Sequence, residues 1–441
     1  MKAGSPGLRA LAMEWYGVIP DHWGAQRFKH LATIRNGQVD PEDPRYRDLP
    51  LFAPNHIESG TGRIVGIESA DEQGAESGKY LVRQGEIVYS KIRPALRKAA
   101  LAPCDGLCSA DMYPVAPRGH ADAGFLLFEM LSEGFSRYSL LESDRVAMPK
   151  INREALGECP FVFPDLPHQK AVAAFLGRKT EAIDSLIQKK ERQIELLREK
   201  RQALITQAVT KGLDPKVPMK DSGVEWLGEI PGHWTVSKLS RLLTESPRNG
   251  ISPPVGGGSV PSFSIAAMRD GTLNIADNIK YVALDEKAAR PYRVRKGDVF
   301  VMRGSGSIEL AASAGLVREE PPNGCTYPDT LIRLRLGPNL RHAFAVAVLN
   351  SPPVRAQLET SMRTAAGIWK ISGDRLSAIQ VPVPPVSDQL GVEAAIGAAS
   401  NWDRAVTARV KEEVDRLREY RQALISAAVT GKIEIPTEEV A

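Results

Sequence analysis

The chain contains the same sequence pattern twice, and this internal repeat constrains its fold more than any other feature. The match is closest at the end of each copy, where LREKRQALITQAVT at residues 197–210 returns as LREYRQALISAAVT at residues 417–430. Earlier matches, in the same order in both copies, are Glu14–Trp15 with Glu225–Trp226, Gly17–Trp23 with Gly228–Trp234, Arg35–Gly37 with Arg248–Gly250, Gly85–Val88 with Gly297–Phe300, Lys150–Ile151 with Lys370–Ile371, and Gln169 with Gln389. Such a series indicates a tandem duplication of a unit of about 220 residues, far longer than the roughly 20–50 residues of a solenoid repeat.

The first part of each copy, on the order of 150 residues, consists of short apolar runs bounded by glycine and proline, which is typical of strands joined by turns. Segments 62–66, 85–90 and 298–302 are expected to be strands, and Ala123–Leu131 and Ala343–Leu349 to be helices. The segment Gly304–Gly306 is expected to form a tight turn. Together these features predict an α+β fold with a β-rich core.

The second part of each copy has the apolar spacing of a long helix. Apolar residues recur at intervals of three and four, and polar side chains interrupt this seam at Lys190, Arg201 and Arg421. The start and stop signals are Pro167 in a first turn, Ser387 as an N-cap, and Gly212 and Gly431 after the last turns. Each helix is expected to span about 40 residues, or roughly 60 Å.

A helix with a single apolar stripe needs a partner in water. Because each copy supplies one such helix, we expect the two helices to pair as an antiparallel coiled coil with pseudo-two-fold symmetry. The alternative is that each helix packs on its own globular part. The expected organisation is a first domain at 1–165, a central helix at 166–212, a second domain at 213–385 and a C-terminal helix at 386–435. This predicts an extended molecule in which a two-helix rod holds two domains apart.

The sequence contains none of the common catalytic motifs. A P-loop, an HExxH zinc motif, a GxSxG nucleophile motif and the Asn-Pro-Pro-aromatic tetrad of amino-methyltransferases are all absent from the chain. His22 and His233 occupy equivalent positions beside tryptophans, where packing of a corner is the expected role. The four cysteines complete no zinc set, so buried thiols and no metal are expected. With no apolar run long enough to span a bilayer and no signal peptide, a cytoplasmic location is expected.

The two globular parts differ in charge. Residues 17–165 contain 17 Lys and Arg against 21 Asp and Glu, a net charge of −4, whereas residues 228–385 contain 19 against 13, a net charge of +6. Both parts contain a basic run, at Lys91–Lys98 and at Arg290–Lys296. Such runs are typical either of phosphate-contacting patches or of solvated strand faces. Different surfaces on one duplicated framework predict two different targets.

The chain resembles the specificity (S) subunits of type I restriction-modification systems. The resemblance is carried by SGVEWLGEIPGHW at 222–234 and its shorter first copy, by SKIRP at 90–94, by FVFP at 161–164 before His168–Gln169, by VPVPP at 381–385 before Asp388–Gln389, and by the arginine-rich helix ends. It extends over essentially the whole chain, in order and twice.

The resemblance implies that each globular part is a target recognition domain that reads one half of a bipartite, asymmetric DNA site, while the paired helices set the spacer. It implies no catalysis by this chain. The implied partners are double-stranded DNA, two methyltransferase (M) subunits and the restriction (R) subunits. The implied cofactors, S-adenosylmethionine and ATP with magnesium, belong to those partner subunits and not to this chain.

Direct reading of bases requires Arg, Lys, Asn, Gln or Ser side chains that reach a DNA groove. The candidate DNA-binding residues are Arg35, Asn36, Lys91, Arg93, Arg97 and Lys150 in the first domain, and Arg248, Asn249, Arg293, Arg303, Ser305 and Lys370 in the second. Lys150 and Lys370 are expected to contact phosphates. The repeated Arg-Asn-Gly segments are identical in the two copies, which suits a shared turn or backbone contact better than the reading of two different sequences.

Two other classes of protein remain as alternatives. One is a scaffold whose coiled coil tethers two protein-binding domains, and the other is a fused nuclease-methyltransferase, which would need several hundred more residues. Neighbouring genes that encode a methyltransferase and a helicase-nuclease would distinguish the S-subunit interpretation from both.

Overall fold

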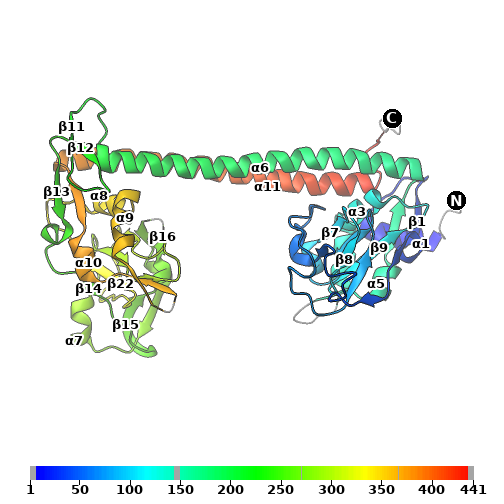
Figure 1. Cartoon of the computed structure of the whole chain (residues 1–441), viewed down its shortest axis with the longest axis horizontal. Helices are drawn as coiled ribbons and strands as arrows, with labels where there is room; N and C mark the ends of the chain where they lie inside the picture. The colour runs from blue at the N-terminus through cyan, green and yellow to red at the C-terminus, as the bar shows by residue number, and fades with distance from the viewer. Residues whose placement is uncertain (1–5, 144–148, 270, 366, 436–441) are drawn as a thin grey trace. The chain divides into compact units, whose positions relative to one another are not determined.

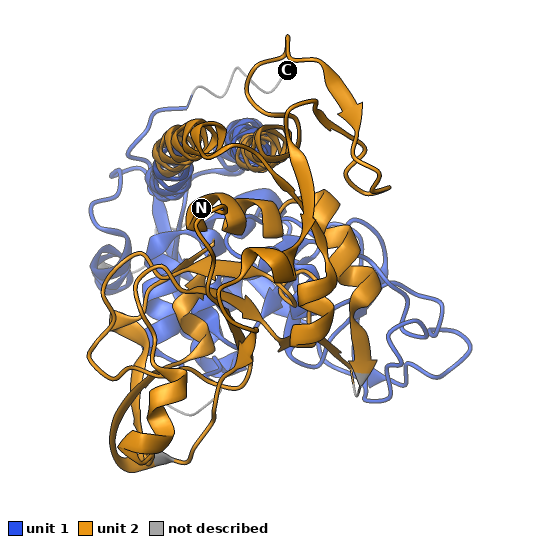
Figure 2. Cartoon of the chain, turned by 90° about the vertical axis from the view of Figure 1, so that its left-hand side faces the viewer, with its two compact units in different colours: residues 1–192, 410–441 blue, residues 193–409 orange. Residues whose placement is uncertain are grey.

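A computed structural model describes residues 6–143, 149–269, 271–365 and 367–435. The chain forms two compact units: unit 1 comprises residues 1–192 and 410–441, and unit 2 comprises residues 193–409 (Figures 1 and 2). Each unit therefore contains one globular part and a segment of each of the two long helices.

Unit 1 contains two four-stranded sheets, with strand orders β2-β9-β6-β7 and β3-β5-β8-β4, and an antiparallel β1–β10 pair. Its elements are α1 (Pro6–Tyr16), β1 (Gly24–Arg27), α2 (Phe28–Leu31), β2 (Ala32–Ile34), β3 (Gln38–Val39), β4 (Leu51–Phe52), the 3₁₀ helix η1 (Pro54–His56), β5 (Lys79–Val82), β6 (Ile87–Ser90), η2 (Pro94–Leu96), β7 (Ala99–Leu101), β8 (Gly106–Cys108), β9 (Met112–Pro117), α3 (Ala123–Leu131), α4 (Glu133–Leu141), α5 (Arg153–Glu158) and β10 (Pro160–Phe163).

Unit 2 contains a six-stranded sheet of order β14-β22-β19-β21-β17-β16, a three-stranded sheet β20-β24-β23, and the pairs β11–β12, β13–β25 and β15–β18. Its elements are β11 (Met219–Asp221), β12 (Glu229–Pro231), β13 (Thr235–Lys238), η3 (Leu239–Leu242), β14 (Arg248–Asn249), β15 (Val255–Phe263), η4 (Ile265–Ala267), β16 (Met268–Arg269), β17 (Thr272–Leu273), η5 (Ala276–Asn278), β18 (Ile279–Val282), α7 (Glu286–Ala289), η6 (Arg290–Tyr292), β19 (Val299–Met302), β20 (Gly304–Ser305), β21 (Ala314–Leu316), β22 (Leu331–Leu334), α8 (His342–Leu349), α9 (Pro352–Ser361), β23 (Arg363–Ala365), β24 (Ile368–Lys370), α10 (Gly373–Ala378) and β25 (Gln380–Val383).

A buried glutamine repeats the same backbone contacts in the two units. The Gln169 amide donates to the carbonyls of Pro164 and His120 at 3.0 and 3.3 Å, and its oxygen accepts from the Asp122 N–H at 2.8 Å. Gln389 donates to the carbonyls of Pro384 and Asn339 at 2.9 Å and accepts from the Arg341 N–H at 2.8 Å. Each glutamine thus joins the start of a long helix, the strand before it and the start of α3 or α8. The predicted α+β duplication is confirmed.

The two long helices are α6 (Leu166–Lys211), of 46 residues, and α11 (Val386–Val429), of 44 residues (Figure 1). At 1.5 Å per residue their lengths are about 69 and 66 Å. In unit 1, Nε of Arg421 lies 2.8 Å from the Asp184 carboxylate, and Nζ of Lys190 lies 2.6 Å from that of Glu413. Along the pair, residue numbers increase on α6 while those of their partners on α11 decrease. The predicted antiparallel pairing is therefore confirmed.

Near their ends, the two helices also pack on the globular parts. Pairing of the helices with each other and packing of the helices on the globular parts therefore both occur. In unit 1, Val172 and Leu176 of α6 and Ile425 and Val429 of α11 lie in the same buried cluster as Phe125. In unit 2, Val209 and Val392 join the cluster around Phe344. Across the described residues, no helix combines the length and apolarity needed to cross a membrane.

Three local predictions were wrong. Segment 62–66 is not a strand; its described pairing is a single Ile57–Ile64 bridge, because Gly60 and Gly62 adopt positive φ and turn the chain. Gly304 and Ser305 form strand β20, paired with β24, and not a tight turn. Ser387 lies inside α11, and its hydroxyl bonds the adjacent Asp388 carboxylate at 3.2 Å, so it does not act as the N-cap.

Candidate nucleic-acid interface

In unit 1, the segment after β6 lies against residues 149–151. Ile92 and Lys150 form an antiparallel bridge, the Arg93 N–H donates to the Pro149 carbonyl at 2.8 Å, and the Ile151 N–H donates to the Lys91 carbonyl at 3.0 Å. These bonds bring together three of the predicted cations, Lys91, Arg93 and Lys150. The side chains of Arg93 and Lys150 are exposed. Arg93 has a φ of 48°, a left-handed conformation that holds its side chain on a tight 3₁₀ turn.

An aromatic ring supports this basic group, which we call the Lys91 cluster (Lys91, Arg93 and Lys150). Nζ of Lys91 lies 5.3 Å from the centre of the Tyr113 ring, and the Arg153 guanidinium lies 4.8 Å from it, within cation–π range. Arg153 also donates to the carbonyls of Ile34 and Arg35 at 3.2 and 2.9 Å. Burial raises the pKa of Tyr113, so the ring remains neutral. Sequence reasoning missed Tyr113 and Arg153, although Arg153 follows the repeated Lys-Ile pair closely.

Two predicted arginines of unit 1 are engaged within the domain. Nε of Arg35 lies 2.8 Å from both carboxylate oxygens of Glu86, and a second guanidinium nitrogen also contacts that carboxylate. This hydrogen bond raises the pKa of Arg35. Arg97 donates to the Ser136 hydroxyl at 2.9 Å, and burial lowers its pKa. Asn36, next to Arg35, has an exposed side chain.

Unit 2 repeats the backbone of the Lys91 cluster. Gly304 pairs with Lys370 as Ile92 does with Lys150, and the Ile371 N–H donates to the Arg303 carbonyl at 2.9 Å, as Ile151 does to Lys91. Arg303, Ser305 and Lys370 therefore occupy the places of Lys91, Arg93 and Lys150; we call them the Arg303 cluster. The Lys370 side chain is exposed.

Asp329 joins the Arg303 cluster to the loop after β14. Arg303 donates to the Asp329 carbonyl at 3.3 Å, and the Ser252 hydroxyl donates to the Asp329 carboxylate at 2.6 Å. Arg248 and Asn249 form β14 just before this loop, and both are exposed. The Tyr327 hydroxyl donates to the Arg248 carbonyl at 3.0 Å.

Arg293 is engaged differently from the other predicted residues of unit 2. Its guanidinium pairs with Glu286 on α7, and its carbonyl accepts hydrogen bonds from Arg333 and Arg335, both at 2.9 Å. The Arg293 carbonyl thus holds the side chains of Arg333 and Arg335 close to each other. Arg333 is almost fully buried, lies 5.6 Å from the centre of the Tyr327 ring and has its pKa lowered by burial.

The remaining chemistry of the chain is sparse. Within the described ranges, no group of three or more His, Cys, Asp or Glu residues is arranged to hold a metal ion. The four cysteines are free, and all but Cys104 are buried. Burial raises the pKa of Cys325 to about 11, which keeps that thiol protonated. The geometry is that of two basic clusters on matching backbones, each with an exposed lysine.

Known proteins resemble the chain in sequence. The EcoDI type I restriction enzyme specificity subunit from Escherichia coli is 40% identical over 154 residues, which are 35% of this chain and 34% of that subunit. The EcoKI type I restriction enzyme specificity subunit from Escherichia coli strain K12 is 26% identical over 274 residues, which are 61% of this chain and 57% of that subunit. The curated relatives are type I specificity subunits. The alignments with these type I specificity subunits thus span 34% and 57% of the relatives' own lengths. No protein-family model matches the chain.

Solved structures related to type I specificity subunits share the fold. A chain from a study of complex assembly and conformational transition in a type I R-M system aligns with a TM-score of 0.72, at 18% identity, over 94% of this chain and 100% of that one. The HsdS subunit from Thermoanaerobacter tengcongensis aligns with a TM-score of 0.51, also at 18% identity, over 96% of this chain and 100% of that one. At this identity the likeness concerns the architecture.

Proposed function

We infer that this chain is the DNA sequence-recognition subunit of a type I restriction-modification complex, and that each globular part reads one half of a bipartite, asymmetric site. One observation carries the inference. The same backbone presents Lys91, Arg93 and Lys150 in one unit and Arg303, Ser305 and Lys370 in the other. A lysine is retained at one of the three positions, as a phosphate contact requires, and the other two positions differ, as reading two sequences requires.

The long helices act in this proposal as the spacer between the half-sites. Two readers on one face of B-DNA are separated by about 34 Å or a multiple of it. Paired helices of 46 and 44 residues are long enough to set such a distance. The spacing then depends on helix length and not on the sequence of the spacer DNA.

The chain itself is non-catalytic in this proposal and recruits its partners. Two M subunits supply S-adenosylmethionine-dependent methylation of adenine, and R subunits supply ATP- and magnesium-dependent cleavage, in the cytoplasm. The outer faces of the helices offer a docking surface for M subunits, with Trp402 and Tyr420 among their exposed large side chains. A subunit that binds DNA within a larger complex need not carry all of the electrostatic attraction, which fits its net charge of +4.

The test is methylome sequencing of a strain that expresses the chain with the M subunit encoded beside it. We expect a bipartite methylated adenine motif that disappears when the gene for this chain is deleted. Exchanging Arg303 and Ser305 for other side chains should alter only one half of the motif. A motif that survives the deletion, or a continuous one, would overturn the proposal.

A further inference from the structure

An antiparallel hairpin in unit 2, formed by β23 and β24, has two faces of different character. Arg363 pairs directly with Lys370, and Thr364 pairs with Trp369. Because side chains alternate along a strand, Ile368 and Lys370 lie on the same face as Arg363, whereas Thr364 and Trp369 lie on the other. We call the first of these the hairpin face (Arg363, Ile368 and Lys370). Arg363 and Ile368 are outside the set of residues predicted from the sequence.

Trp369 fixes the orientation of the hairpin. Its side chain is partly buried against the cluster of unit 2 that contains Phe344, so the face that carries Trp369 is turned toward the core. On the opposite face, Arg363 and Lys370 are exposed, and 39% of the Ile368 surface is accessible. The hairpin face is therefore turned toward solvent.

Strand β20 extends the hairpin face, because it pairs with β24 on the side away from β23. A Cβ atom at Gly304 would lie 3.2 Å from Cγ of Lys370 and 3.6 Å from Cγ2 of Ile368, so this position belongs to the same face. Glycine leaves the position without a side chain. A glycine within a sheet often marks a place where a ligand approaches the backbone closely.

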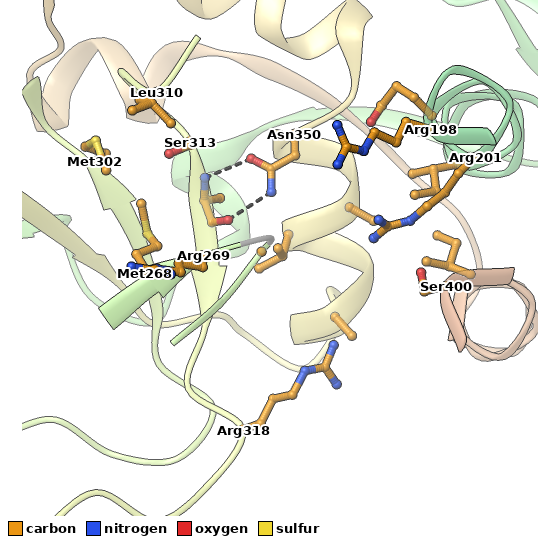
Figure 3. A pocket seen from close by; sticks show the side chains of 18 residues that line it. Arg198, Arg201, Met268, Arg269, Met302, Leu310, Ser313, Arg318, Asn350 and Ser400 are labelled. Atoms are coloured by element: carbon orange, nitrogen blue, oxygen red, sulfur yellow. Dashed lines mark hydrogen bonds between the residues drawn. The ribbon is translucent and has the colours of Figure 1, made fainter. Parts of the chain in front are cut away.

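The hairpin is anchored in the core of unit 2. Met362, just before β23, and Ile371, just after β24, are both buried. Asn350 accepts from the Ala314 N–H at 2.8 Å and donates to the Ala314 carbonyl at 2.9 Å, which fastens the end of α8 to β21 (Figure 3). Strand β21 pairs with β19, which leads into β20. The hairpin face is thus held by rigid elements, as precise recognition requires.

The charges of the hairpin face favour a polyanionic ligand. Residues 361–371 contain two cations, Arg363 and Lys370, and no Asp or Glu. Like charges directly opposite each other on paired strands destabilise a hairpin. Among the residues that the structure describes, neither side chain has a hydrogen-bond or ion-pair partner. The phosphates of double-stranded DNA would relieve this repulsion, and the major groove of DNA admits a two-stranded β-ribbon.

We propose that the hairpin face enters the major groove of the half-site that unit 2 reads, where Arg363 binds a guanine and Ile368 contacts the methyl group of a neighbouring thymine. The planar guanidinium of Arg363 can donate two hydrogen bonds to guanine O6 and N7, and an apolar side chain complements the thymine methyl group. Lys370 contacts a phosphate beside them. This assignment rests on the proposed function and names two specificity-determining residues for it.

Fluorescence anisotropy of the complex with M subunits, on duplexes that carry the methylated motif, tests the assignment. Arg363→Ala should weaken binding about tenfold and relax the preference for guanine at one position of one half-site. Arg363→Lys keeps the charge but loses the paired donors, so it should relax the same position and leave the salt dependence unchanged. Deoxyuridine in place of the contacted thymine removes only the methyl group. It should weaken binding of the unaltered complex about fourfold and that of the Ile368→Ala complex hardly at all.

Thr364→Ala is the matched control, because Thr364 lies on the same hairpin but on its other face. It should bind DNA as the unaltered chain does, and circular dichroism verifies that each variant is folded. Uniform weakening of all sequences by Arg363→Ala, or equal effects of Arg363→Ala and Thr364→Ala, would overturn the assignment. If Arg363→Ala reads the bipartite motif normally, the assignment fails and the proposed function stands. If the unaltered complex binds no specific site, both fail.

Discussion

Unit 1 and unit 2 share a backbone arrangement, but different charged side chains form the ion pairs in each unit. In both units an acidic side chain closes the turn before a central strand: Glu86 accepts from the Arg83 N–H at 3.1 Å, and Asp298 accepts from the Arg295 N–H at 2.9 Å. Their arginine partners differ. Arg35, which follows β2, binds Glu86, whereas Arg335, which follows β22, binds Asp298. Backbone hydrogen bonds are thus retained between the copies, while side-chain partners have been exchanged.

This difference indicates which positions are free to change function. A residue whose backbone makes the contact, such as Lys91 or Arg303, can vary in its side chain without disturbing the strand that it ends. A residue whose side chain is the contact, such as Gln169 or Gln389, cannot.

Lengthening the helices should change the spacing that both units share. Inserting about four residues into each helix, after Ile187 in α6 and after Leu417 in α11, adds about 6 Å, close to two base pairs. Binding to the original site should fall toward the non-specific level, about 4–10 kcal/mol weaker, and return on a site with a longer spacer. Methylation mapping checks both. Altered bases in either half-site would show that the helices do more than set distance.

Removing the buried arginine should affect unit 1 far more than its equivalent affects unit 2. Arg421 and Asp184 have side chains that are 6% and 9% exposed. Arg421→Ala leaves the Asp184 carboxylate buried without its partner, which should lower the free energy of unfolding by about 3–5 kcal/mol. Arg201→Ala should cost less, because the Arg201 side chain is 32% exposed and lies 3.8 Å from the buried Asp403 carboxylate, too far for a hydrogen bond. Urea denaturation followed by circular dichroism measures both, and equal losses would contradict the assigned contacts.

Substitution in the two basic clusters should affect one half-site at a time. Arg93→Ala and Arg303→Ala should each weaken DNA binding by the M-containing complex by about 1–3 kcal/mol and relax one position of one half-site. Lys150→Ala and Lys370→Ala should weaken binding to every sequence equally and make the salt dependence shallower. Fluorescence anisotropy at several salt concentrations separates these outcomes. A uniform loss for Arg93→Ala would identify it as a phosphate contact.

Glu129 places a carboxyl group where unit 2 has Val348. Glu129 is fully buried, accepts from the Val162 N–H at 2.7 Å with one oxygen and leaves the other without a partner. Burial raises the pKa of Glu129 well above the usual range. The contribution of Glu129 to the free energy of unfolding is therefore highest at low pH, where Glu129 is protonated, and decreases as the pH rises above the pKa that Glu129 has in the unfolded chain. Glu129→Gln should therefore raise the free energy of unfolding at pH 8 by roughly 1 kcal/mol and change it little at pH 4.

Urea unfolding at the two pH values measures this effect. Val348→Gln is the reverse experiment in unit 2, where an amide would be buried without a partner and should destabilise the protein at both pH values. A Glu129→Gln variant that is less stable at pH 8 would show that the charged carboxylate is tolerated in the core.

The smallest effect concerns the corner at the start of each long helix. The Asp388 carboxylate lies 2.8 Å from Nε2 of His233 and accepts from Nε1 of Trp234 at 3.0 Å. The hydrogen bond with His233 lowers the pKa of Asp388, so its contribution to stability is present at neutral pH and is lost as pH falls through that lowered pKa. Asp388→Asn should cost about 0.5 kcal/mol at pH 7, and the difference from the unaltered chain should shrink on acidification.

Unit 1 offers the control for this corner, because His168 occupies the place of Asp388 and its ring lies 5.7 Å from that of Trp23. The stability of His168→Asn relative to the unaltered chain should not change in this way as the pH falls. If both variants respond alike, the hydrogen bond to His233 is not the cause. Chemical denaturation at neutral and at acidic pH is the measurement.

Identical sequence did not predict identical roles where long-range packing intervenes. The two Arg-Asn-Gly segments match letter for letter, yet Gly37 has a φ of +84° and open space around it, whereas a Cβ on Gly250 would collide with the carbonyls of Tyr327 and Pro328. Arg35 is paired with Glu86, while Arg248 is exposed on β14. The third residue in each segment is glycine for a different physical reason, which no local pattern contains.

The duplication, the α+β class, the two long helices and their antiparallel pairing can be predicted from the amino-acid sequence. These follow from periodicity and from the order of repeated motifs, because apolar stripes of such length must be buried against each other. The folded chain shows which basic residues lie together, which are engaged in ion pairs, and that Tyr113 and Arg153 support one cluster. Those contacts join residues tens of positions apart, and their geometry depends on strand pairing and turn conformation that short motifs leave open.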